Sequence, residues 1–286
     1  MPVVQTFEET LEGGERLAAL ASAMGRLPAE AVVRRLGGPG RAPAQPRDAV
    51  PAPATAPASE SEFVPVPEPL LGLLPGGLRR GEAAALPTRE QSPDYLALAL
   101  LAEALKAGLW CAAVGVADLG LAALSGLLGP AARRQAALDR LLLVPQPAQQ
   151  WAEITATLAD GVDLLLVRPD TPVPAATAQR IDARLRQGRS AGTRHSAALL
   201  VLGGWPTARL ALRVARTDWT GLDGVGPTAG TGHLTAGRAT VVAQGRATAG
   251  RPRVARLWLP DETGAVRSLC DTPRLSLAAA TVGPAA

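Results

Sequence analysis

Lysine, cysteine and aromatic residues are scarce in this chain. Of the 286 residues only 3% are aromatic, and Lys106 is the single lysine, so arginine supplies almost all of the positive charge. The two cysteines, Cys111 and Cys270, stand far apart and have no metal-ligand spacing. We therefore expect neither a structural zinc site nor a disulfide framework. Both cysteines are expected to be free thiols in a reducing compartment.

A long apolar run and a secretion signal are also missing. The Leu-rich stretch 96–128 is interrupted by Glu103, Lys106 and Asp118, too often for a membrane-spanning helix. Four glutamates lie within the first 15 residues, where a signal peptide needs a positive start and an apolar run. These absences predict a cytoplasmic protein.

The composition that remains is that of a globular protein. Hydrophobic residues make up 47% of the chain, enough for one sizeable α/β domain with tails. The net charge of +4 permits an acidic partner, such as nucleic acid or an acidic protein face, without requiring one.

Composition divides the chain into four segments. Residues 1–36 contain a candidate amphipathic helix within Thr6–Leu36, and residues 37–69 carry nine prolines and are expected to form an extended linker. Residues 70–270 form the predicted core domain, and 271–286 are expected to be a frayed tail.

Short apolar runs alternate with helical segments in the core domain, which predicts βαβ units around a parallel sheet. The predicted strands are Glu82–Leu86, Trp110–Val116, Arg140–Val144, Asp163–Val167 and Ala197–Leu202. The predicted helices are Ser92–Lys106, a helix capped by Asp118 that ends at Leu128, Ala148–Ala159 and Pro174–Gln187. Partly alternating runs follow, at Arg209–Thr217, Arg238–Arg246 and Arg253–Pro260, as in antiparallel strands. The fold class is α/β, with a mostly parallel sheet that ends in a β-meander.

Three segments resemble the core of RecA-type ATPases. They are GLRRGEAAALPTREQSPDYLALALLAEALKAG, WCAAVGVADLGLAAL and LDRLLLVPQPAQQWAEITATLADGVDLLLVRPD. The segments TDWTGL and GHLTAGRATVVAQGRATAGRPRVARLWLP are similar to a divergent group of these proteins, ImuA′. The resemblance covers residues 70 to 260 and implies a RecA-like three-layer core. It also implies a role in SOS-induced translesion synthesis, with an ImuB-like Y-family polymerase homologue and an error-prone C-family DNA polymerase as partners.

The same resemblance places the phosphate-binding loop on PTREQSPD, residues 87–94. Pro87 and Ser92 stand at the two glycine positions, Pro93 replaces the lysine, and Asp94 replaces the magnesium-binding hydroxyl. A phosphate loop needs backbone N–H groups and positive charge, whereas Pro93 removes a donor and Asp94 adds a negative charge. We therefore expect no nucleotide cofactor and no ATPase activity.

The metal-binding strand is equally altered. Arg168 follows the apolar run Leu164–Val167, where the resemblance calls for a magnesium-orienting aspartate, and Asp170 comes two residues later. Asp118 falls near the acidic catalytic position, but it also suits a helix N-cap. His195 and His233 lie in Gly/Ser/Thr-rich neighbourhoods without triad partners and are expected to be ordinary loop residues. The glycines of GTGHLTAG are expected to form a turn between strands.

Binding is the remaining role, and arginines dominate residues 205–260. The candidate partner or nucleic-acid residues are Arg209, Arg213, Arg216, Arg238, Arg246, Arg251, Arg253, Arg256, Trp205 and Trp219. Paired strands could bring Arg209, Arg213 and Arg253 together on one surface. A solvated outer face, with packed tryptophans, explains the same residues without any ligand.

Three functional hypotheses follow. The first is an adaptor in translesion synthesis that binds protein partners. The second is a module that uses the same arginines to bind single-stranded DNA or a recombinase. The third is a RecA-family ATPase with a cryptic nucleotide site. Oligomeric state is left open by the sequence.

Overall fold

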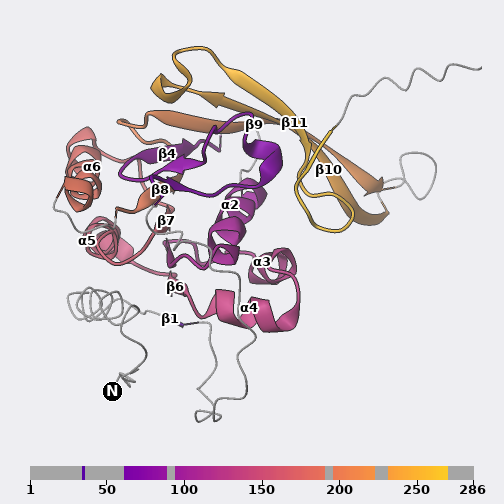
Figure 1. Cartoon of the computed structure of the whole chain (residues 1–286), viewed down its shortest axis with the longest axis horizontal. Coiled ribbons are helices and arrows are strands. Elements are labelled where there is room, and N and C mark those ends of the chain that lie inside the picture. The colour runs from indigo at the N-terminus through magenta and orange to yellow at the C-terminus, as the bar shows by residue number, and fades with distance from the viewer. Residues whose placement is uncertain (1–33, 36–60, 89–93, 191–195, 223–230, 270–286) are drawn as a thin grey trace, which may run out of the picture.

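The computed structural model describes residues 34–35, 61–88, 94–190, 196–222 and 231–269. These residues form one ten-stranded mixed sheet, whose parallel half lies between two layers of helices, and a separate two-stranded sheet (Figure 1). Within the described ranges, no helix combines the length and the apolar composition needed to cross a membrane. The predicted N-terminal helix and the C-terminal tail lie outside these ranges, apart from Arg34 and Arg35.

Five short strands form the parallel half of the sheet. They are β4 (Ala83–Leu86), β5 (Cys111–Val114), β6 (Leu141–Val144), β7 (Leu164–Val167) and β8 (Ala198–Leu202), in the spatial order β6-β5-β7-β8-β4. Every residue of these strands is buried. Continuous apolar runs are therefore required here, because each strand is covered on both faces.

Helices cover both faces of the parallel half, as Figure 1 shows. One core cluster joins alternate strand residues to α2 (Asp94–Lys106), α3 (Leu121–Leu127) and α4 (Ala131–Leu138). A second cluster joins the other strand residues to α5 (Trp151–Leu158), which follows the short η3 (Ala148–Gln150), and to α6 (Ala175–Ser190). This is the three-layer architecture predicted from the sequence.

Antiparallel strands extend the sheet beyond β4. β9 (Leu210–Leu222) runs parallel to β4 and then pairs antiparallel with β10 (Gly232–Gln244), followed by β11 (Arg253–Trp258) and β12 (Arg267–Ser268). Leu212, Val214, Val241 and Leu257 place the inner face of these strands in the α2 cluster. The predicted meander is confirmed, and we call β9–β12 the antiparallel extension.

Several local predictions were wrong. GHLTAG belongs to β10 rather than to a turn, and Gly120 occupies the N-cap of α3 in place of Asp118. The helix α4 was missed, because its apolar content is low and alanine-based. Arg34 and Arg35 form a short strand, β1, beside β6 rather than the end of a helix.

The folded domain also begins before residue 70. Within the predicted linker, β2 (Phe63–Val64) pairs with β3 (Leu78–Arg79), and η2 (Glu68–Leu70) follows. Val64 and Val66 are buried in the α2 cluster. A proline fixes φ and lacks an N–H, but it does not prevent its neighbours from being buried. The prolines of this segment therefore stiffen a part of the chain that is packed.

A buried ion pair ties four segments of the parallel half together. Arg80 and Asp163 are each 3% exposed, and Arg80 Nη1 donates to Asp163 Oδ1 at 2.9 Å and to the Ser196 carbonyl oxygen at 3.1 Å. The other carboxylate oxygen accepts a hydrogen bond from the Trp110 backbone N–H at 2.9 Å. The pair therefore fixes the starts of β4, β5, β7 and β8 relative to one another.

A second contact joins the antiparallel extension to the start of α2. The Tyr95 hydroxyl donates a hydrogen bond to the Gly264 carbonyl oxygen. Gly264 lies in the turn between β11 and β12, whose shape is set by Asp261. The Asp261 carboxylate accepts from the Thr263 and Ala265 backbone N–H groups at 2.8 and 2.9 Å.

Candidate functional site

The turn predicted to have lost its phosphate-binding residues lies between β4 and α2. Pro87 and Thr88 follow directly after β4, and Asp94 is the first residue of α2. The middle of the turn, with Ser92 and Pro93, lies outside the described residues. The position predicted from the sequence, between the first core strand and its helix, is therefore the position observed.

Arg168 occupies the edge of the sheet next to this turn. It follows β7 directly, and its Nη2 atom lies 2.9 Å from Asp94 Oδ1. Its Nη1 atom pairs with Oδ1 of Asp118, which comes from the loop after β5. We call Arg168, Asp94 and Asp118 the arginine triad. It links the carboxyl ends of β5 and β7 to the start of α2.

A glycine allows the backbone of this edge to pack closely. Gly115 follows β5 with φ of +76°, and a Cβ atom there would lie 2.4 Å from the Arg168 carbonyl oxygen. No L-residue with a side chain fits at this distance without moving the backbone. The loop after β5, which carries Asp118, is therefore held against the segment that carries Arg168.

The residues present do not fit a magnesium–nucleotide complex. Arg168 puts a permanent positive charge where the resemblance calls for a carboxylate that orients the metal, and both nearby acids pair with it. Asp170 is exposed, and Lys106 pairs with Glu103 at 3.3 Å at the far end of α2. Neither Asp170 nor Lys106 therefore replaces the missing metal-orienting acid or the missing phosphate-binding lysine.

The buried cysteine is not a nucleophile of this site. Burial raises the pKa of the Cys111 thiol well above its ordinary value, and the nearby Asp163 carboxylate raises it further. A thiol that stays protonated is chemically inert. Cys111 therefore belongs to the apolar packing of β5.

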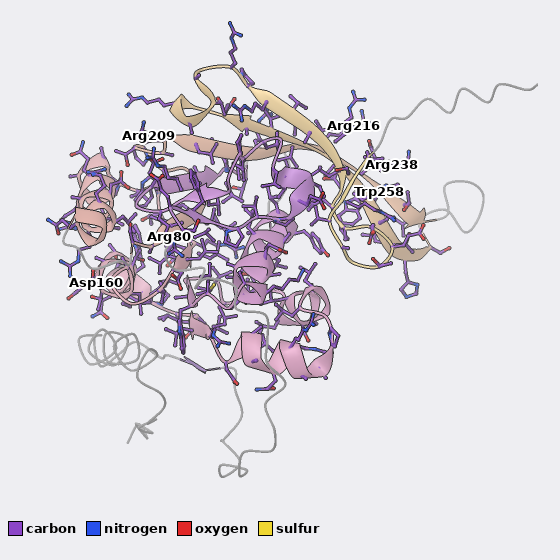
Figure 2. All side chains as sticks on the ribbon, viewed as in Figure 1. Arg80, Asp160, Arg209, Arg216, Arg238 and Trp258 are labelled. Atoms are coloured by element: carbon purple, nitrogen blue, oxygen red, sulfur yellow. The ribbon has the colours of Figure 1, made fainter. Side chains whose placement is uncertain are left out.

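The predicted grouping of Arg209, Arg213 and Arg253 is wrong. Arg213 is paired with Val242, whereas Arg253 is paired with Ala243, the next residue of β10. Because neighbouring residues of a strand point to opposite faces, Arg213 and Arg253 lie on opposite sides of the sheet. Arg209 pairs with Glu82 at 3.2 Å, and Figure 2 shows it well away from Arg216 and Arg238.

Strand pairing brings a different set of arginines onto one face. Three cross-strand rows define it: Arg213–Val242–Val254, Arg216–Thr240–Arg256 and Asp218–Arg238–Trp258–Arg267. We call this set of residues the arginine face. Four of its five arginines were predicted from the sequence, and Arg267 was not. Arg267 could have been included from the sequence, because it lies only a short turn after the strand β11.

The remaining basic candidates lie elsewhere. Arg246 begins the short η4 helix (Arg246–Thr248), and Arg251 lies in the turn that follows it. Both are exposed, but they lie outside the three rows. The structure therefore divides the predicted arginines into a face of the sheet, a separate pair at the β10–β11 turn, and Arg209 and Arg253, which lie outside both.

The two candidate tryptophans differ sharply in exposure. Trp205 is 6% exposed, donates its indole N–H to Asp182 at 3.1 Å and packs edge-on against Trp151 at 6.5 Å. It is a core residue, so its prediction as a partner or nucleic-acid residue is wrong. Trp219 is 46% exposed and lies over Gly237, on the face opposite the arginines.

Comparisons with known proteins relate the chain to a family model, a mycobacterial protein and a solved structure. Residues 72–207 match the family described as the MT3502 N-terminal domain. The Mycobacterium tuberculosis (strain ATCC 25618 / H37Rv) protein described as "Uncharacterized protein Rv3395c" is 34% identical over 155 residues, which cover 53% of this chain and 69% of that protein. The solved structure of the RadB recombinase is similar with a TM-score of 0.49 and 14% identity, over 71% of this chain and 97% of that one. By its likeness to Rv3395c, this chain belongs to the family of that mycobacterial protein.

Proposed function

We propose that this chain is a RecA-like scaffold that has lost nucleotide hydrolysis and works by binding partners. The observation that carries the proposal is the arginine triad. Asp94 stands at the start of α2 and Arg168 at the end of β7, the two places where the RecA resemblance requires groups that bind phosphate and magnesium. Here these two residues bind each other.

Electrostatics explain why the triad disfavours a bound nucleotide. A triphosphate would meet the Asp94 carboxylate at the start of α2, where phosphate binding needs free N–H donors and positive charge. A magnesium ion would meet the guanidinium of Arg168, which keeps its charge at any accessible pH. Both would have to break ion pairs that Arg168 already makes with Asp94 and Asp118 at this edge.

Calorimetric titration with magnesium-ATP tests this proposal. The full chain is expected to show no binding up to millimolar ATP, and no ATP hydrolysis above the buffer rate. The Arg168→Ala variant is expected to behave in the same way, because it removes the cation without restoring a lysine or the loop glycines. An Arg184→Ala variant, which breaks a surface pair with Asp160, serves as the control. Micromolar affinity in the unmodified chain would overturn the proposal.

We further propose that the scaffold is an adaptor in SOS-induced translesion synthesis. The support is the resemblance of residues 70 to 260 to the ImuA′ group, which implies an ImuB-like Y-family polymerase homologue and an error-prone C-family DNA polymerase as partners. Copurification of the full chain with such a homologue from the same organism is the test. A stable complex that survives 0.5 M salt is expected for a protein interface, whereas failure to copurify at low salt contradicts the adaptor role.

A further inference from the structure

We propose that the arginine face binds single-stranded nucleic acid. This inference goes beyond the scaffold role and does not depend on the arginine triad, which lies at the edge of the parallel half. It rests on the exposure of one side of the antiparallel extension among the described residues, on the pattern of charge there, and on the one aromatic ring within the rows.

The arginine face continues the side of the sheet that α5 and α6 cover. Ala211, two residues before Arg213 on β9, packs with the α5 and α6 cluster. From Arg213 onward this side carries polar side chains that reach the solvent. The side chains of Arg216 and Arg267 are 74% and 65% exposed, and Arg238 and Arg256 are exposed as well.

The rows make a compact array of positive charge. Successive rows are two residues apart, so three rows extend about 13 Å along the strands, and four strands cover about 14 Å across them. Five arginines lie within this area, and Asp218 is the one acidic residue in the rows. A guanidinium group can donate two parallel hydrogen bonds to the oxygens of one phosphate. Several phosphates therefore fit on the array.

Arg216 and Arg267 each lie beside an acidic residue. Arg216 Nη2 lies 2.8 Å from Asp218 Oδ1, and Arg267 Nη2 lies 3.2 Å from Asp261 Oδ2. An exposed pair such as Arg216–Asp218 contributes little and exchanges readily for a phosphate. Asp218 consequently weakens phosphate binding, and its removal is expected to strengthen it.

Trp258 gives the array a surface for bases. The Arg238 guanidinium lies 4.9 Å from the centre of the Trp258 ring (Figure 2). Val254, two rows away on the same strand, is 60% exposed. Unstacked bases pack on aromatic rings and guanidinium planes, whereas the bases of a duplex are hidden. The face therefore fits a single strand better than a duplex.

The same observations disfavour an acidic protein as the ligand. A protein interface needs a buried apolar centre, and hot spots cluster in it. Of the exposed large apolar side chains in the described residues (Leu71, Trp219, Leu222, Leu234 and Val254), only Val254 lies in the three rows. Arginines with few apolar neighbours are typical of phosphate recognition.

Fluorescence anisotropy with labelled dT20 and the full chain tests the inference. We expect binding at low salt, with log Kd changing against log salt by about 2 to 3, as for three or four phosphate contacts on a single strand. The triple variant R216E/R238E/R256E is expected to bind at least about tenfold more weakly. The triple variant R133E/R180E/R251E changes the net charge equally on exposed arginines elsewhere and is expected to change Kd by less than about threefold.

Two further measurements separate this ligand from its alternatives. Asp218→Asn is expected to tighten dT20 binding about two- to threefold, a gain that general damage to the fold would not produce. Unlabelled poly-L-glutamate of matched charge and a 20-base-pair duplex are expected to compete more weakly than unlabelled dT20. The absence of dT20 binding, equal losses in the two triple variants, or equal competition by poly-L-glutamate would overturn the inference.

Discussion

Arginine has opposite roles in the two halves of the sheet. In the parallel half, Arg168 lies between two aspartates and pairs with both, and Arg80 is buried against Asp163. In the antiparallel extension, the rows of the arginine face hold five arginines and one aspartate, Asp218, and Asp261 of the β11–β12 turn also pairs with Arg267. The comparison shows that the count of arginines says little by itself. An arginine surrounded by carboxylates pairs with them, whereas an arginine with few carboxylates within reach can bind an anionic ligand.

The largest expected effect comes from the buried pair of the parallel half. Asp163→Ala leaves Arg80 charged and without its carboxylate in the core, which is expected to cost about 3–5 kcal/mol of the free energy of unfolding. Denaturant titration followed by circular dichroism measures it. Asp160→Ala, which removes a partly exposed ion pair with Arg184, is the control and is expected to cost less than about 1 kcal/mol. Equal losses of stability in the two variants would show that Arg80 can stay buried without its carboxylate at little cost in free energy.

The next effect concerns the turn of the extension that contacts α2. Burial by itself raises the pKa of Asp261, but hydrogen bonds from the Thr263 side chain and from the Ala265 and Thr263 backbone, with the charge of Arg267, bring it below its ordinary value. Asp261→Asn is expected to cost about 1–3 kcal/mol at pH 7, since it leaves the part-buried donors of Thr263 and Ala265 poorly matched.

The pH dependence of that loss follows from the sign of the shift. A lowered pKa in the folded state gives stability that is fully present above the unfolded value of about 4 and is lost as pH falls through the folded pKa. The difference between the unmodified chain and Asp261→Asn is therefore expected to shrink below about pH 4. Thermal unfolding at several pH values measures it, and a difference that persists unchanged at pH 2 contradicts the assignment.

A smaller effect is expected on the arginine face itself. Arg238→Ala removes the guanidinium from the Trp258 ring and is expected to cost about 0.5–1 kcal/mol of the free energy of unfolding. Arg246→Ala, on the separate η4 turn, is the matched control and is expected to change stability by less than about 0.5 kcal/mol. A large loss of stability from Arg238→Ala would mean that Arg238 stabilises the fold. The arginines of the two halves would then not differ in role.

The smallest effect is expected at the arginine triad. Its side chains are partly to largely exposed, at 28% for Arg168, 52% for Asp94 and 71% for Asp118. Arg168→Ala is therefore expected to cost no more than about 1 kcal/mol in denaturant titration, and less in high salt. A loss several times larger, or one that salt does not reduce, would indicate that the triad fixes the fold rather than the charge at this edge.

The sequence predicted the parallel half better than the extension, for physical reasons. Strands such as Leu164–Val167 are buried on both faces, so each leaves an unbroken apolar run. The turn after β4 was placed correctly, because the residues that fail to match a phosphate loop lie between a recognisable strand and helix. The partners of Arg168 could not be predicted, since they come from segments 50 and 74 residues away.

The extension depends on strand pairing that no local pattern specifies. A register irregularity lies between Thr240 and Val241 of β10, where two neighbouring residues pair with Arg216 and Val214 of β9. Such a shift changes which side chains share a face, because the side-chain period of a strand is two. The alternation in the sequence therefore revealed the strands, while the grouping of the arginines required the pairing itself.

The bond between Tyr95 and Gly264 gives the molecule a natural reporter. Tyr95 is the only tyrosine in the chain, and burial, with the Asp261 charge as a second cause, raises its pKa to about 12. The ultraviolet absorbance of a single phenol therefore records whether the β11–β12 turn is docked on the first turn of α2. Undocking without unfolding would move the titration midpoint back toward 10. One optical titration thus follows the junction between the two halves of the sheet, without a label.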